Sequence, residues 1–125
     1  MGSDRATVTI FMDLRLSVTE QDGVMVLAAQ GEIDVSTAPA LRQELVELAA
    51  AGSGSVVVDL QGVDFLDSTG LGVLVSGLKR FRTGGSDLLL VVTSPRIGKV
   101  FEITGLTQVF SMHESLDDAV AAARG

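Results

Sequence analysis

The hydrophobic and polar positions alternate strictly near the start of the chain. Between Met12 and Thr19 every second residue is apolar, a period of two that is typical of a β-strand with one face in water. Asp22–Gly23 then offers a tight turn, and the nearly continuous apolar stretch Val24–Ala29 predicts a second strand covered on both faces. We expect these strands to form an antiparallel hairpin. Residues 1–10 show little pattern and are expected to be a loose N-terminal segment.

After the hairpin, the pattern alternates between helical and strand spacing. Helices are predicted over residues 37–51, 68–81, 95–104 and 115–123, and short strands over residues 56–60, 88–92 and 109–112. The connections are short, and repeated strand–helix crossovers place neighbouring strands in parallel with right-handed connections. The sequence therefore predicts an α/β fold in one domain over residues 11–124. It should contain a mixed, mostly parallel β-sheet of about five strands and about four α-helices.

Composition excludes several classes of function. Sixteen acidic residues against nine basic ones give a net charge of −7, which argues against nucleic acid as a partner because phosphate neutralisation needs surplus Lys and Arg. The chain has no Cys and a single His, so thiol chemistry and Cys- or His-rich metal centres are excluded. No apolar run approaches the roughly 20 residues that span a bilayer, and no signal peptide is evident at the N-terminus. We therefore expect a soluble, cytoplasmic protein with no membrane partner.

The candidate chemistry lies in three loops that follow predicted strands. These loops are residues 31–37, 64–72 and 93–96, and they should meet at one edge because the carboxyl ends of parallel strands share an edge of the sheet. Ser68 starts a helix, and Gly70 and Gly72 keep the first turn bare. A phosphoryl group on Ser68 would face the positive end of the helix dipole. It would also add about −1.5 to −2 charges beside Asp34 and Asp67.

Simpler and enzymatic interpretations of the same residues remain open at this point. Ser68 is also a favoured residue type for an ordinary helix N-cap. As a nucleophile it would need a base, but His113 belongs to a different strand–helix unit and is expected to be an ordinary surface residue. Asp34 and Asp67 resemble a carboxylate pair, yet the sequence lacks the aromatic residues of a sugar cleft. Asp34, Asp64 and Asp67 together would offer oxygen ligands for Mg²⁺.

Five segments of the chain resemble the STAS family, and within it the freestanding bacterial anti-sigma factor antagonists. The segments are Gly31–Asp34, Ala38–Leu41, Val56–Leu60, Phe65–Leu74 and Phe101–Leu106. The likeness runs from about Leu14 to Val120, and the Asp-Ser-Thr-Gly-Leu-Gly core that begins at Asp67 is its most specific part. The resemblance implies a STAS-like fold and a binding module without catalytic residues, metal or cofactor of its own.

The resemblance further implies a phosphorylation switch. The partner would be an anti-sigma factor that is also an ATP-dependent serine kinase, and ATP would be bound by that partner. The unphosphorylated chain would bind it and release a sigma factor, phosphorylation of Ser68 would end binding, and a serine phosphatase would restore it. The implied partner-binding residues are Asp34, Ser36, Thr37, Asp67, Ser68, Thr69, Gly70, Leu71, Gly72, Ser94 and Arg96. The alternative is a non-switching STAS subunit of a stressosome or lipid-transport complex.

The charges are unevenly distributed along the chain. Residues 1–67 contain eleven acids and three bases, a net −8, whereas residues 68–125 contain five acids and six bases, a net +1. The sign changes near Ser68. We hypothesise that this polarity orients the partner and that high salt slows association.

Overall fold

The computed structural model describes residues 7–125, which build a six-stranded sheet whose strands lie in chain order. The strands are β1 (Thr7–Phe11), β2 (Leu14–Gln21), β3 (Val24–Ile33), β4 (Val56–Leu66), β5 (Leu88–Val91) and β6 (Ser111–His113). The helices are α1 (Ala38–Ala51), α2 (Ser68–Thr83), α3 (Pro95–Ile103) and α4 (Leu116–Arg124). Strands β1 to β3 pair antiparallel, and β3 to β6 pair parallel. The predicted mixed α/β fold is confirmed, with six strands rather than about five.

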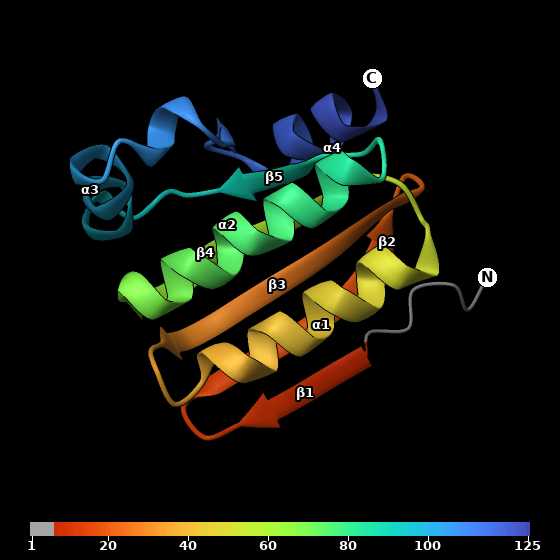
Figure 1. Cartoon of the computed structure of the whole chain (residues 1–125). Helices are drawn as coiled ribbons and strands as arrows, with labels where there is room; N and C mark the ends of the chain where they lie inside the picture. Colours follow the sequence, from red (N-terminus) through yellow and green to blue (C-terminus); the bar gives the residue numbers. More distant parts are fainter. Residues whose placement is uncertain (1–6) are drawn as a thin grey trace.

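Helices cover the two faces of the sheet unequally. Figure 1 shows α1 and α2 side by side over one face, and their apolar sides join α3 in the larger core. Helix α4 packs against the other face, where Ala119 and Val120 contact a smaller cluster that includes Val26, Val57 and Val91. None of the helices in residues 7–125 is long and apolar enough to cross a bilayer.

The expectation of a loose N-terminal segment is wrong for residues 7–10. These residues belong to β1, which pairs with β2 so that Ile10 lies opposite Arg15. The strand's β-branched residues suit this edge position. Thr7–Ile10 alternate between polar and apolar residues over four positions only, and Phe11 then breaks the pattern, so the run was too short to stand out as a strand. Met12, at φ 56°, forms the turn before β2. Residues 1–6 lie outside the described residues.

The central strands extend further than their apolar pattern predicts. Strand β4 continues to Leu66, six residues beyond the predicted end, and β3 continues to Ile33. Polar residues such as Asp59 and Gln61 interrupt the apolar pattern of β4, and the ladder between β3 and β4 shifts register twice. The last strand lies at residues 111–113 instead of 109–112. The two principal site loops therefore shrink to residues 34–37 and to Asp67 alone.

Candidate functional site

The ends of β3 and β4 are joined directly at the carboxyl edge of the sheet. Ile33 is paired with Leu66 in the ladder, and the backbone N–H of Asp67 donates to the carbonyl of Ile33 at 3.2 Å. Adjacent strands lie about 5 Å apart. Asp34 and Asp67, which follow these paired residues, are therefore neighbours at the same edge, as the sequence predicts.

Asp67, and not Ser68, caps helix α2. The Asp67 backbone is extended, and its carboxylate accepts the backbone N–H of Gly70 at 3.0 Å. Its carbonyl accepts the N–H of Leu71 at 3.0 Å. The interpretation of Ser68 as an ordinary N-cap is thus wrong, because β4 runs straight into Asp67 and the helix starts one residue later. Ser68 is the first helical residue, and its side chain is free of the capping role.

Ser68 is exposed at the positive end of α2. Ser68 and Thr69 are both exposed to solvent. Their backbone N–H groups occupy the first two helical positions, which have no partner within a helix. These donors and the helix dipole favour an anion at the helix start. The site can therefore carry a phosphoryl group on the Ser68 hydroxyl without loss of the helix cap.

The glycines after Ser68 have different roles. A side chain on Gly70 would place its Cβ 2.6 Å from Ile33 Cγ2 and 2.6 Å from Leu66 Cδ1, whereas a Cβ on Gly72 would meet open space. Gly70 therefore lets the helix start press against the sheet, and only Gly72 keeps the outer surface bare as predicted. Leu71 is also buried in the core, at 7% exposure. Among the predicted partner residues, Gly70 and Leu71 thus support the fold and offer no side-chain surface.

Asp34 organises the loop that lies beside Asp67. Its Oδ1 accepts the backbone N–H groups of Ser36 at 2.9 Å and Thr37 at 3.0 Å. The Thr37 hydroxyl donates to the Glu32 carbonyl at 2.8 Å and accepts the Asp34 N–H at 2.9 Å. Thr37 is 1% exposed, so its predicted role in partner contact is replaced by a structural one. Asp34 is half-buried and Ser36 exposed, and both remain available to a partner.

The third predicted loop follows β5 at the same end of the parallel strands. Ser94 caps α3, where its hydroxyl accepts the N–H of Ile97 at 3.4 Å. Arg96 is exposed in the first turn of this helix. Because β5 pairs in parallel with β4, this loop leaves the same edge as Asp67. Ser94 thus has a local structural role, and Arg96 is the residue of this loop that offers a charge to solvent.

Two exposed apolar residues beside this site were missed by the sequence analysis. Val35 is 69% exposed in the loop after β3, and Phe65 is 47% exposed near the end of β4. Exposed large side chains of this kind often mark contact surfaces when they cluster. The available signal was their position, since each is an apolar residue next to an aspartate in one of the predicted site loops.

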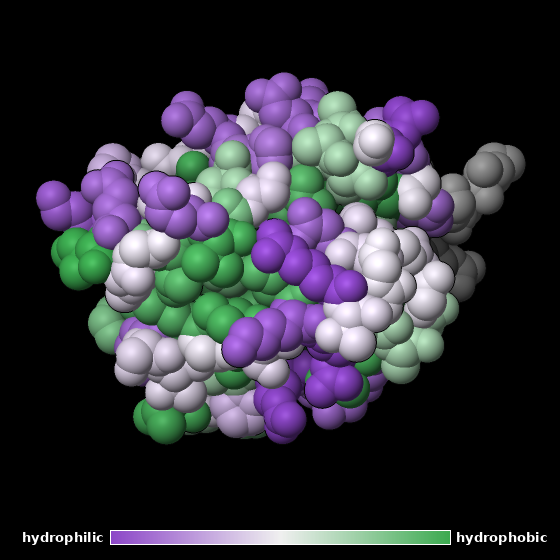
Figure 2. Space-filling view, turned by 45° about the horizontal axis from the view of Figure 1, so that its top comes forward, coloured by the Kyte–Doolittle hydropathy of each residue, from purple (hydrophilic) through white to green (hydrophobic). Residues whose placement is uncertain are grey.

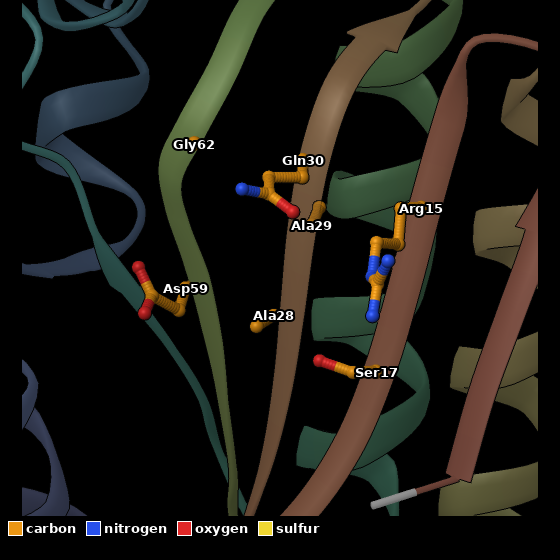
Figure 3. Close-up of a pocket in the computed structure, with 7 residues that line it drawn as sticks. All are labelled: Arg15, Ser17, Ala28, Ala29, Gln30, Asp59 and Gly62. Atoms are coloured by element: carbon orange, nitrogen blue, oxygen red, sulfur yellow. The ribbon is translucent and has the colours of Figure 1, made fainter.

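A separate groove lies on the open part of the sheet face that α4 leaves uncovered. Figure 3 shows Arg15 and Ser17 on β2 and Gln30 on β3 beside Asp59 on β4. The groove has a volume of ≈ 280 Å³. Asp59 uses its carboxylate to bind the backbone and side-chain amides of Gln61, at 3.0 and 3.2 Å. None of the predicted site residues lines this groove.

The enzymatic interpretations gain no support from the geometry of the described residues. His113 lies 3.0 Å from the Ser111 hydroxyl through Nε2 and belongs to β6, so its hydrogen-bond partner is not Ser68. Within residues 7–125, no three His, Cys, Asp or Glu residues are grouped so that they could hold a metal ion. The hypothesis of an Mg²⁺ site formed by Asp34, Asp64 and Asp67 is therefore not supported in this part of the chain.

The described geometry is that of a small α/β domain with an exposed helix start at the carboxyl edge of its sheet, and the comparisons identify its family. The sequence matches the STAS domain family over residues 15–119, and the chain belongs to that family. It is 36% identical to the anti-sigma-B factor antagonist of Staphylococcus aureus (strain NCTC 8325 / PS 47) over 106 residues, 85% of this chain and 98% of the relative.

Solved structures show the same similarity. An anti-sigma factor antagonist from Mycobacterium paratuberculosis has a TM-score of 0.81 and 33% identity, covering 98% of this chain and 97% of the other. The Bacillus cell fate determinant SpoIIAA in its phosphorylated form has a TM-score of 0.63, covering 94% and 98% of the two chains, with 17% identity. At that identity, the second likeness shows the fold alone.

Proposed function

We propose that this chain is an anti-sigma factor antagonist controlled by phosphorylation of Ser68. In its unphosphorylated form, it binds an anti-sigma factor with serine kinase activity and thereby frees a sigma factor. Transfer of a phosphoryl group from the partner's ATP to the Ser68 hydroxyl ends binding, and a serine phosphatase reverses the change. In this proposal the chain is not an enzyme, since ATP and the kinase residues belong to the partner.

One observation carries the proposal: Ser68 is exposed as the first residue of α2 while Asp67 provides the cap. A kinase can therefore take up the Ser68 hydroxyl without removing a hydrogen bond on which α2 depends. The names of the relatives supply the class of partner, since those at 33–36% identity are called anti-sigma factor antagonists. SpoIIAA, which shares the fold, has been solved in an unphosphorylated and a phosphorylated form.

The switch would act through charge. A phosphoserine carries about −1.5 to −2 charges at pH 7, and it would be placed beside the carboxylates of Asp34 and Asp67. The helix start tolerates the new anion within the chain, but a partner surface that fits the neutral serine would meet a cluster of negative charge. A loss of about 3 kcal/mol in binding free energy corresponds to about a hundredfold weaker affinity. Such a change redistributes a limited pool of partner.

A pull-down from the native organism tests this proposal. The chain is used as bait with and without ATP, and the bait is afterwards examined by mass spectrometry at Ser68. We expect an anti-sigma factor to be retained without ATP and released as Ser68 gains phosphate. Ser68→Ala should retain the partner in both conditions, and Ser68→Asp should retain little. Equal retention by both variants, with no phosphate on Ser68, would contradict the proposal and favour a non-switching STAS subunit.

A further inference from the structure

A groove between α1 and α2 begins directly beside Ser68. Its volume is ≈ 570 Å³, and it is lined from the Asp34 loop by Val35, from α1 by residues that include Val46, and from α2 by Thr69 and Val73. Figure 2 shows a hydrophobic area near the centre of the visible surface, with hydrophilic side chains along its edge. Since Val35 follows Asp34 and Thr69 follows Ser68, this α1–α2 groove is continuous with the candidate switch site.

The groove carries apolar side chains that the buried core leaves partly exposed. Helices α1 and α2 bury Leu41, Leu45 and Leu74 against the sheet. Val35 lies outside that core at 69% exposure, and Val46 and Val73 are half-buried. Apolar side chains left together in solvent and bordered by polar groups are typical of a protein contact surface.

The groove is positively charged, whereas the protein as a whole is acidic. Arg42 and Arg80 line it, and none of its lining residues is acidic, although the whole chain carries a net charge of −7. Within residues 7–125, the one ion pair is between Arg82 and Asp87, so the guanidinium groups of Arg42 and Arg80 have no carboxylate partner there. This pair of cations is complementary to an acidic ligand.

The dimensions fit a helix. Thr69 and Arg80 are eleven residues apart on α2, which is about 16 Å along the axis at 1.5 Å per residue. That length accommodates about three turns of a helix laid along the groove, with apolar residues at i, i+3, i+4 and i+7.

We propose that the α1–α2 groove binds an amphipathic helix of the anti-sigma factor, whose apolar face is bordered by Asp or Glu residues. Its apolar side chains pack on Val35, Val46 and Val73, and its carboxylates meet Arg42 and Arg80. This inference rests on the proposed function, because it names the contact that holds the partner while the kinase site reaches Ser68. The charges also set the direction of docking, with Asp34 and Asp67 at one end of the surface and Arg80 at the other.

Charge reversal tests the groove against a matched control. All variants are made in the Ser68→Ala background, so that phosphorylation does not change during the measurement. The probe is the recombinant anti-sigma factor retained by Ser68→Ala in the pull-down. The test pair is Arg42→Glu with Arg80→Glu, and the control pair is Lys79→Glu with Lys99→Glu, two exposed residues that line none of the grooves described above. Both pairs change the net charge equally, and circular dichroism checks their folding.

We expect the groove pair to weaken binding at least 30-fold and the control pair less than threefold. Replacement by Lys of the partner's Asp or Glu residues that face the groove should raise its affinity for the groove pair by at least tenfold. Binding by the groove pair within threefold of the parent, or equal losses in both pairs, would overturn the inference. A dimer of this chain that the groove pair abolishes would also overturn it and assign the groove to a second copy. Ser68→Asp is measured in the same assay, and its weak binding would leave the proposed function standing in each of these cases.

Discussion

The carboxylate of Asp67 accepts the backbone N–H of Gly70 at 3.0 Å, and this hydrogen bond separates two tasks that could have fallen to one residue. Asp67 stabilises the start of α2, and Ser68 offers its hydroxyl to solvent. If a single serine both capped the helix and accepted phosphate, each phosphorylation would disturb the helix. In this arrangement, modification of Ser68 leaves the cap in place.

The division of tasks predicts unequal effects on stability. Asp67→Ala should lower the free energy of unfolding by about 1 kcal/mol, because the N–H of Gly70 loses its acceptor. Ser68→Ala should change it by less than about 0.5 kcal/mol, as expected for an exposed residue without a structural contact. Urea unfolding followed by circular dichroism measures both variants. A larger cost for Ser68→Ala than for Asp67→Ala would show that the serine is the cap.

Two glycines in the first turns of α2 should respond in opposite ways to alanine. Gly70→Ala places a methyl group 2.6 Å from side-chain carbons of Ile33 and Leu66, and such overpacking should cost about 1–3 kcal/mol of stability. Gly72→Ala meets open space and should stabilise the helix by up to about 1 kcal/mol. Thermal unfolding of the two variants provides the comparison. Equal effects would disprove the close approach of α2 to the sheet.

The charge of Asp34 should contribute to the switch without being needed for the fold. Asp34→Asn retains an Oδ1 that can accept the N–H groups of Ser36 and Thr37, so the variant should fold normally. Removal of the charge should narrow the difference in partner affinity between Ser68→Ala and Ser68→Asp. Asp22→Asn, in the turn between β2 and β3, is the control and should leave that difference unchanged. If the affinity difference between Ser68→Ala and Ser68→Asp were the same with and without Asp34→Asn, the charge of Asp34 would have no part in the switch.

Salt should slow the association of the partner. The acidic edge around Asp34 and Asp67 and the cations Arg42 and Arg80 give the surface a charge pattern that can steer an oppositely patterned partner. Raising the ionic strength from 0.05 to 0.5 M (about 14 to 4 Å in screening length) should lower the association rate constant by about tenfold. Stopped-flow measurement of binding checks this, and rates that do not change with salt would discard electrostatic steering.

The sequence predicted the order of the elements well, because the central strands and the helices carry strong periodicity. It missed β1, because Thr7–Ile10 alternate between polar and apolar residues over only four positions before Phe11 breaks the pattern. It also ended β4 too early at Leu60, because Asp59 and Gln61 resemble the start of a loop. In the fold these side chains point to the partly open face of the sheet, and only strand pairing reveals that they belong to a strand.

The sequence predicted which loops form the candidate site, but it did not predict the hydrogen bonds within them. Both Asp67 and Ser68 are favoured N-cap residues, and the choice between them depends on where β4 ends, which the pairing of Ile33 with Leu66 fixes. The burial of Thr37 and Leu71 likewise follows from tertiary packing. The α1–α2 groove was not foreseen, because its residues come from one loop and two helices that only the fold brings together.

The most direct test of the switch compares the affinity of one purified partner for two forms of this chain. Isothermal titration calorimetry would measure the dissociation constant of the anti-sigma factor for the unphosphorylated chain and for the chain phosphorylated stoichiometrically at Ser68. We expect the phosphate to weaken binding by about a hundredfold, equivalent to about 3 kcal/mol. Equal dissociation constants for the two forms would contradict it.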